Sequence, residues 1–278
     1  MKMITTLKLK VSVQSFLVKF GIGVARYNRL QKKISAAIDL EKLQQYNSSY
    51  AKLLLQYLGK SKSQIRQDLF VLSHLNFKKN GFFVEFGATN GLRFSNSHLM
   101  EKEFGWNGIL AEPAKCWHKE LKKNRACNIE VDCIWKDSKS ILTFNEVDVA
   151  ELSTINSFTD NDLHSEARKK GKTYDVQTIS LNDLLKKYNA PKIIDYLSID
   201  TEGSEYRILS HFDFEEYSFK VITCEHNFTP MREKIFSLLT QKGYQRVLPE
   251  LSKFDDWYIK PTQQQKLKQI TNEGVPQL

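Results

Sequence analysis

The chain has 278 residues, 41% of them apolar and 12% aromatic, which is enough for one large domain with a packed core and an appended segment. Its net charge of +9 suggests a polyanion-binding protein until the charges are mapped along the chain. Residues 1–60 hold eleven Lys or Arg and two Asp or Glu, whereas residues 61–278 hold thirty of each. The larger part is neutral, so a nucleic-acid partner is not expected.

Residues 1–60 are predicted to form a basic helical extension of the main domain. Apolar residues recur at helical spacing from Ser15 onward, and basic residues cluster between Arg26 and Lys33. One interpretation is that residues 1–35 lie on the anionic surface of a membrane; another is a helix whose basic face is merely solvated. A transit peptide is a third, because the first 38 residues contain no acid.

No apolar run is long enough to span a membrane, and the four cysteines show no metal-binding or redox spacing. The cysteines are therefore expected to be reduced thiols. We expect a cytoplasmic protein, with peripheral attachment to the inner face of a membrane as a variant of that location.

Residues 81–91 are the most informative stretch. An apolar run that contains Glu85 is typical of a buried strand, and Gly87 and Gly91 belong to the turn that follows it. This order is typical of the first strand and nucleoside-binding turn of a doubly wound α/β domain. A dinucleotide site has glycine where Thr89 stands, and Glu85 would repel a pyrophosphate. The loop therefore favours a cationic nucleoside, S-adenosylmethionine, over NAD.

Helices and strands alternate along the rest of the chain, which predicts an α/β fold with a doubly wound sheet over residues 61–262, followed by a polar tail over 263–278. Residues 146–175 are polar and are expected to form an irregular lid or a disordered segment. Helices are expected over residues 40–58, 64–75, 97–104, 114–124, 181–188 and 231–240. Strands are expected over residues 109–112, 129–133, 141–144, 194–199, 221–224, 244–248 and 256–259, the last two as an antiparallel edge.

Acidic residues follow the predicted strands, at the edge of the sheet where this architecture binds ligands. Glu112 ends the second strand twenty-one residues after Gly91, where an acid bonds a ribose hydroxyl; a surface acid before a turn is the alternative. Asp132 and Cys133 end the third strand, where an adenine would lie, although Asp132 could instead cap the loop.

Four residues that follow later strands are predicted to converge beside the transferred methyl group: Asp200, Glu202, Glu225 and His226. His226 suits the task of a general base, and the carboxylates could orient an acceptor hydroxyl. Alternatively, Asp200, Glu202 and Glu225 hold Mg²⁺ or a similar divalent metal that acidifies the acceptor. A third interpretation leaves His226 as a satisfied core histidine.

Taken together, these stretches resemble the FkbM family of S-adenosylmethionine-dependent methyltransferases. The resemblance spans about residues 61–260 and depends on the motifs at 63–70, 83–91, 95–97, 101–113, 195–203, 225–227 and 256–258. It implies the seven-stranded class I (Rossmann-like) methyltransferase sheet and, usually, O-methylation of sugars or polyketide-like molecules. Three positions depart from the family's usual residues: Asn90 for Asp, Phe86 for Ile and Cys133 for Ala.

The resemblance also supports a donor site. The residues predicted to form it are Glu85, Phe86, Gly87, Ala88, Asn90, Gly91, Ser95, Asn96, Glu112, Asp132 and Cys133. The function predicted from the sequence is S-adenosylmethionine-dependent O-methylation of a hydroxyl on a sugar, glycolipid or small metabolite. Two alternatives belong to other classes: a nicotinamide-dependent oxidoreductase on the same type of fold, and a non-catalytic membrane or RNA adaptor that acts through the basic N-terminus.

Overall fold

The computed structural model describes residues 24–158, 165–169 and 171–261, and the chain divides into two compact units, Met1–Leu58 and Gly59–Leu278. The described part of the first unit is helical. The helix predicted over residues 40–58 is interrupted, because Asn47 leaves the helical conformation (φ −145°, ψ 82°). The elements of this unit are α2 (Val24–Tyr46), η1 (Ser48–Tyr50) and α3 (Ala51–Leu58).

The expectations for residues 1–23 and for the polar tail at 263–278 lie outside the described residues. Among the helices that the structure describes, none is long and apolar enough to cross a membrane. Along α2, Leu30, Ile34 and Ile38 are 50%, 44% and 49% exposed. Their four-residue spacing places them on one side of the helix.

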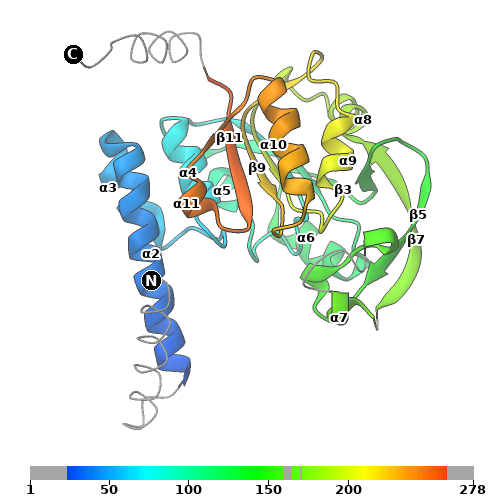
Figure 1. Cartoon of the computed structure of the whole chain (residues 1–278), viewed down its shortest axis with the longest axis horizontal. Coiled ribbons are helices and arrows are strands. Elements are labelled where there is room, and N and C mark those ends of the chain that lie inside the picture. The colour runs from blue at the N-terminus through cyan, green and yellow to red at the C-terminus, as the bar shows by residue number, and fades with distance from the viewer. Residues whose placement is uncertain (1–23, 159–164, 170, 262–278) are drawn as a thin grey trace. The chain divides into compact units, whose positions relative to one another are not determined.

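The second unit is built on a mixed sheet of seven strands in the order β10-β11-β9-β8-β1-β2-β3 (Figure 1). The five strands from β9 to β3 are parallel, and β11 runs antiparallel between β9 and β10. The predicted antiparallel pairing of the last two strands is confirmed, although only β10 lies at the edge. The strands are β1 (Phe82–Phe86), β2 (Asn107–Ala111), β3 (Asn128–Glu130), β8 (Ile193–Ile199), β9 (Ser218–Glu225), β10 (Gln245–Val247) and β11 (Asp255–Ile259).

Helices cover both faces of this sheet, with α8, α9 and α10 on one side and α4 and α5 on the other (Figure 1). The first face is packed by apolar side chains: Val84 and Leu197 of the central strands share one buried cluster with Leu184, Ile208 and Leu239 of the helices. The helix predicted over residues 181–188 begins with a cap, since the Ser180 hydroxyl accepts the N–H of Asp183 at 3.1 Å. The helices are α4 (Gln67–His74), α5 (His98–Phe104), α6 (His118–Asn124), α7 (Ser165–Arg168), α8 (Leu181–Lys187), α9 (Glu205–Ser210), α10 (Met231–Gln241) and α11 (Pro249–Ser252).

A second sheet, in the order β4-β7-β5-β6, takes up both ends of the segment predicted to be irregular over residues 146–175. The prediction is wrong there, because β5 (Ile141–Glu146) and β7 (Lys172–Ser180) pair as long antiparallel strands. The sheet buries a small cluster that includes Trp135 and Val176. Its other strands are β4 (Cys133–Trp135) and β6 (Thr154–Ile155).

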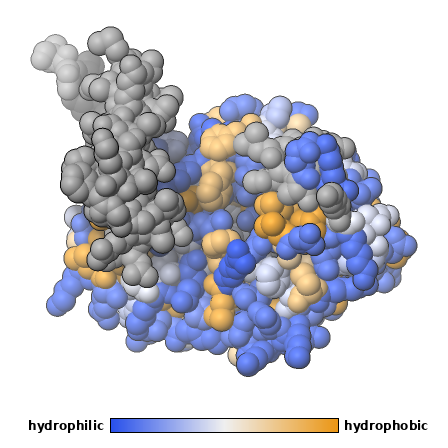
Figure 2. Space-filling view, turned by 90° about the horizontal axis from the view of Figure 1, so that it is seen from below, coloured by the Kyte–Doolittle hydropathy of each residue, from blue (hydrophilic) through white to orange (hydrophobic). Residues whose placement is uncertain are grey.

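The surface of the molecule carries apolar side chains in several groups among polar ones, on the face that Figure 2 shows. Exposed large apolar residues of the second unit include Phe94, Val131, Val149 and Phe228. Two of them, Phe94 and Val149, also line the cavity described next.

Candidate functional site

A cavity of about 410 Å³ lies at the carboxyl ends of β1, β2, β8 and β9, the edge at which the fold predicts a ligand site. Nine of the predicted site residues line it: Glu85, Phe86, Gly87, Asn96, Glu112, Cys133, Asp200, Glu202 and Glu225. Six lie outside its lining: Ala88, Asn90, Gly91, Ser95, Asp132 and His226.

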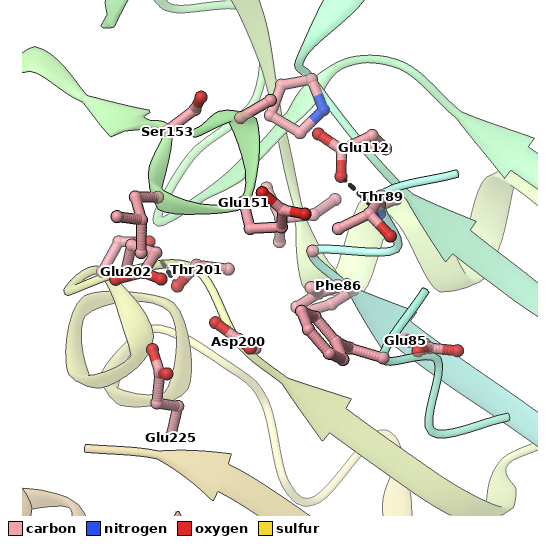
Figure 3. A pocket seen from close by; sticks show the side chains of 18 of the residues that line it. Glu85, Phe86, Thr89, Glu112, Glu151, Ser153, Asp200, Thr201, Glu202 and Glu225 are labelled. Carbon is pink, nitrogen blue, oxygen red and sulfur yellow. Dashed lines mark hydrogen bonds between the residues drawn. The ribbon is translucent and has the colours of Figure 1, made fainter. Parts of the chain in front are cut away.

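The Glu85 carboxylate is occupied by donors of the protein itself. Its Oε1 accepts the backbone N–H of Asn96 at 2.7 Å, and its Oε2 accepts the Ser95 hydroxyl at 3.1 Å and the Ser97 hydroxyl. The fully buried Arg125 lies 3.9 Å away. Figure 3 shows this carboxylate pointing away from the other labelled carboxylates. The structure therefore corrects the expectation that Glu85 attracts a sulfonium directly: its charge is compensated, and it holds the adjoining turn in place.

Three residues of the β1 turn, Gly87, Thr89 and Gly91, have positive φ angles. Gly87 (φ +69°) touches the end of β8, because a Cβ here would lie 2.2 Å from the backbone oxygen of Asp200. Thr89 (φ +47°) is unusual for a β-branched residue. Its N–H donates to Glu112 at 2.7 Å and its hydroxyl to the Arg93 carbonyl at 2.9 Å. These bonds hold a threonine in the conformation that a glycine would adopt.

Three further residues of this turn, predicted to touch the donor, face the protein instead. The Asn90 Oδ1 accepts the backbone N–H of Arg93 at 2.8 Å, which closes the turn on itself. A Cβ on Gly91 would meet the side chain of Arg125, and Ala88 is buried. Their structural role is to shape the loop rather than to line the cavity.

Glu112 lies at the end of β2 on the opposite wall from the later strand ends (Figure 3). Its Oε2 accepts the N–H of Thr89, and its Oε1 accepts the N–H of Ala114 at 2.9 Å. Burial raises the pKa of this carboxyl to about 7, and the charge of Asp200 adds to the effect. Each oxygen of a carboxylate has room for a second donor. Glu112 can therefore still accept hydroxyl groups of a ligand.

The structure corrects the predicted position of Asp132 and Cys133. The third strand of the main sheet stops at Glu130, and Cys133 begins β4 of the second sheet. Asp132 falls in the link between the two sheets, outside the cavity lining. Cys133 does line the cavity, and burial raises the pKa of its thiol to about 12, so it stays protonated.

Three carboxylates gather at the ends of β8 and β9. One oxygen from each of Asp200, Glu202 and Glu225 lies within 4.8 Å of the other two. The carboxyls of Asp200 and Glu225 hydrogen-bond to each other. Burial, followed by the charges of Asp200 and Glu202, raises the pKa of Glu225 well above its ordinary range. Burial also raises the pKa of Asp200. The predicted convergence of these acids is thus present, in one wall of the cavity.

His226 does not join this group as a base. Its Nδ1 accepts the backbone N–H of Phe228 at 3.0 Å, so its Nε2 carries the proton and donates to the carbonyl of Asp255 at 3.1 Å. Burial lowers the pKa of the ring. Both nitrogens are therefore used within the protein, away from the cavity, and the prediction of His226 as the base is wrong in this structure. The alternative of a satisfied core histidine describes it.

Sequence reasoning named no residue of residues 149–155, which line another part of the cavity. Glu151 and Ser153 lie on this wall (Figure 3). Behind it Arg168 is buried, with Nε donating to the Leu152 carbonyl and Nη2 to Glu202, both at 2.7 Å. This arginine ties the wall to the carboxylate cluster. Its place in a run of basic residues resembles a solvated turn, so the sequence contained no signal for its burial.

The family model of the FkbM methyltransferase domain matches residues 85–246, which is more than half of the chain. The chain belongs to the FkbM family of S-adenosylmethionine-dependent methyltransferases. The FkbM match includes the β1 turn, Glu112 and the three carboxylates. The seven-stranded sheet with its antiparallel β11 is the class I methyltransferase sheet that the sequence resemblance implied.

Solved structures show weaker likenesses. Methyltransferase FkbM from Methylobacillus flagellatus is 11% identical, with 80% of this chain and 58% of that chain covered and a TM-score of 0.43. Precorrin-6y C5,15-methyltransferase from Geobacter metallireducens is 11% identical, with 64% and 70% covered and a TM-score of 0.36. A TehB-like methyltransferase from Corynebacterium glutamicum is 6% identical, with 77% and 97% covered and a TM-score of 0.38. No curated protein matches in sequence. The family assignment depends on the family model alone.

Proposed function

We propose that the protein transfers a methyl group from S-adenosylmethionine to a hydroxyl oxygen of a sugar, glycolipid or small metabolite. The observation that carries this proposal is one cavity with Glu112 on one wall and Asp200, Glu202 and Glu225 on another, in a chain of the FkbM family. The oxidoreductase alternative loses its support with that family assignment.

The residues of the cavity fit the donor. Glu112 has acceptor positions left for the two ribose hydroxyls, and Pro113, Ile134 and Phe144 add apolar surface suited to a purine. The volume of about 410 Å³ is within the range of small-molecule sites.

When bound, S-adenosylmethionine supplies an electrophilic methyl carbon: the acceptor oxygen bonds to it as the C–S bond breaks, and that bond's electrons stay on sulfur. The protein must align the acceptor and help its hydroxyl to lose a proton. Asp200 and Glu225 are the groups at the cavity that can accept a hydrogen bond from that hydroxyl. Glu151 and Ser153 lie where they can contact the rest of the acceptor.

Calorimetric titration of the whole chain with S-adenosylhomocysteine and with NAD tests the donor assignment. We expect S-adenosylhomocysteine to bind and NAD not to bind. Glu112→Ala should weaken the binding about 10- to 100-fold, because hydrogen bonds to a charged group contribute about 1.5–3 kcal/mol. Glu233→Ala, which removes an exposed acid of α10, is the matched control. NAD binding, or equal affinities in both variants, would refute the proposal.

The acceptor can be sought with the same protein. Labelled methyl groups from the donor should enter a hydroxyl-bearing fraction of an extract from the source cell, and mild acid or base should leave the ether product intact. Label that enters only amines or thiols would contradict O-methylation while leaving methyl transfer itself supported.

A further inference from the structure

Two of the three carboxylates in the cavity wall have no cationic partner among the described residues. Glu202 pairs with Arg168 at 2.7 Å and accepts the side-chain amide of Asn227 at 3.3 Å. In the part of the chain that the structure describes, Asp200 and Glu225 have only each other as side-chain hydrogen-bonding partners.

The Glu225 side chain makes this imbalance costly. Glu225 is only 7% exposed, and Figure 3 shows its carboxyl directed toward Asp200 and Glu202. A buried carboxylate is normally paired with a cation, satisfied by N–H or O–H donors, or used to coordinate a metal. Among the described residues, Glu225 has no cation and no N–H or O–H donor from outside the cluster. Its oxygens therefore face a space that lacks a positive group.

Other buried acids of the same unit are satisfied, which shows that the imbalance is local. Asp195 bonds the amines of Lys78 and Lys220, each within 2.8 Å. Glu205, the first residue of α9, accepts two backbone N–H groups and a hydroxyl from the turn before the helix. Asp256 binds two arginines. The fold therefore supplies donors to its structural acids, and the pair at the cavity stands apart from these.

We propose that Asp200, Glu202 and Glu225 bind one divalent cation of the Mg²⁺ or Mn²⁺ type. Their spacing of at most 4.8 Å between oxygens allows one ion to touch all three after small side-chain adjustments. Hard divalent cations prefer carboxylate oxygens and keep other positions for water or substrate.

The site gives the cation a task in the proposed function, on which this part of the inference rests. An acceptor hydroxyl that binds the ion becomes more acidic. Its proton passes to water as the new O–C bond forms and the C–S bond of the donor breaks. The ion can bind in the absence of S-adenosylmethionine, so the cation site and the methyltransferase function can fail separately.

The site is tested by titrating the full chain with Mn²⁺ and measuring the free ion by its electron paramagnetic resonance signal. We expect one saturable Mn²⁺ per chain, displaced by Mg²⁺. Glu225→Gln and Asp200→Asn keep the side-chain size and should weaken binding about 10- to 100-fold. Glu151→Gln removes another acid of the same cavity, one that is paired with Arg93 at 2.5 Å, and should leave Mn²⁺ affinity unchanged.

Thermal unfolding provides a second readout that shows the variants are folded. Mn²⁺ should raise the midpoint temperature of unfolding of the wild type and of Glu151→Gln, but not that of Glu225→Gln. Without metal, Glu225→Gln should unfold at a higher temperature than the wild type, because the substitution removes a repulsion.

Several results would overturn the cation site. They are the absence of saturable Mn²⁺ binding, equal affinity in the wild type and Glu225→Gln, and saturation by an amine such as spermidine in place of Mn²⁺. S-adenosylhomocysteine affinity, measured on the same samples, separates the two proposals. Donor binding without Mn²⁺ binding defeats the cation site alone, and Mn²⁺ binding without donor binding defeats the methyltransferase alone.

Discussion

The contact between Gly87 and the end of β8 leads to a sharp prediction for Gly87→Ala. The glycine has φ +69°, and an added Cβ would lie 2.2 Å from the backbone oxygen of Asp200. That oxygen belongs to a strand end and cannot move as a flexible side chain would. The substitution must therefore separate the β1 turn from β8, at the point where both line the cavity.

The magnitude follows from two contributions. An L-residue in the left-handed region costs about 1–2 kcal/mol, of which about 0.4–1 kcal/mol is offset because alanine restricts the unfolded chain. Steric overlap with a packed backbone adds about 1–3 kcal/mol. We expect Gly87→Ala to lower the free energy of unfolding by about 2–4 kcal/mol. For a unit of this size, that loss lowers the melting temperature by about 4–16 °C.

Gly243→Ala separates the two contributions. Gly243 has φ +82°, but nothing lies within 4 Å of its missing Cβ. This variant should lose only the conformational part, about 1 kcal/mol or less. Urea unfolding gives both free energies, and titration with S-adenosylhomocysteine should show weaker binding in Gly87→Ala alone. If the two variants have the same stability and the same affinity, the close approach of Gly87 to Asp200 is not what the site requires.

Three further predictions concern Glu112, Arg168 and the N-terminal unit. Since burial raises the pKa of Glu112 to about 7, S-adenosylhomocysteine should bind more tightly as pH rises from about 6 to 8. Because its folded state holds that proton more tightly than the unfolded chain, the ligand-free wild type should lose stability mainly as pH rises from the ordinary pKa of 4.5 to about 7, and should change little above that. Glu112→Gln should flatten both profiles in calorimetry and urea unfolding. Arg168→Ala, which removes the arginine paired with the buried Glu202 carboxylate, should cost about 3–5 kcal/mol, and adding Glu202→Gln should restore part of it in a double-mutant cycle. If the basic segment contacts lipid, residues 59–278 expressed alone should keep their affinity for S-adenosylhomocysteine but no longer sediment with anionic vesicles. Ile34→Glu in the full chain should weaken that sedimentation. Loss of S-adenosylhomocysteine binding on truncation would favour the adaptor alternative.

The strands of the main sheet could be predicted because their signals are local. Apolar runs such as residues 82–86 and 193–199 are buried on both faces, and burial on both faces requires a continuous apolar sequence. The second sheet was predicted only in part: a strand was expected over residues 141–144, where β5 lies, but β7 was not expected. Only part of β7 is buried, including Val176 and Ile179, and its partner β5 lies about thirty residues earlier in the chain. A strand of this kind is stabilised by pairing with a distant strand, and the local sequence pattern does not indicate that partner.

The candidate site shows the same division between local and distant causes. Sequence spacing places Asp200 and Glu225 at neighbouring strand ends, and the parallel pairing of β8 and β9 then brings them together. Whether the carboxylate at a strand end can bind a ligand depends on hydrogen-bond donors supplied by other segments of the chain. Glu85 is satisfied by Ser97, twelve residues away, and by the adjacent turn. His226 is removed from the site by a carbonyl of β11.

Acids at strand ends therefore fall into two groups that look alike in the sequence. Glu85 is surrounded by hydrogen-bond donors and holds a turn in place, so replacing it should disturb the fold before it disturbs any ligand. Asp200 and Glu225 are enclosed with no donors from outside their cluster among the described residues. A buried charge without a partner lowers stability, and a fold retains such a cost where a ligand compensates it. Among the described residues, the absence of a cation or a hydrogen-bond donor from outside this pair, rather than the presence of a carboxylate, supports our proposal that the pair binds a ligand.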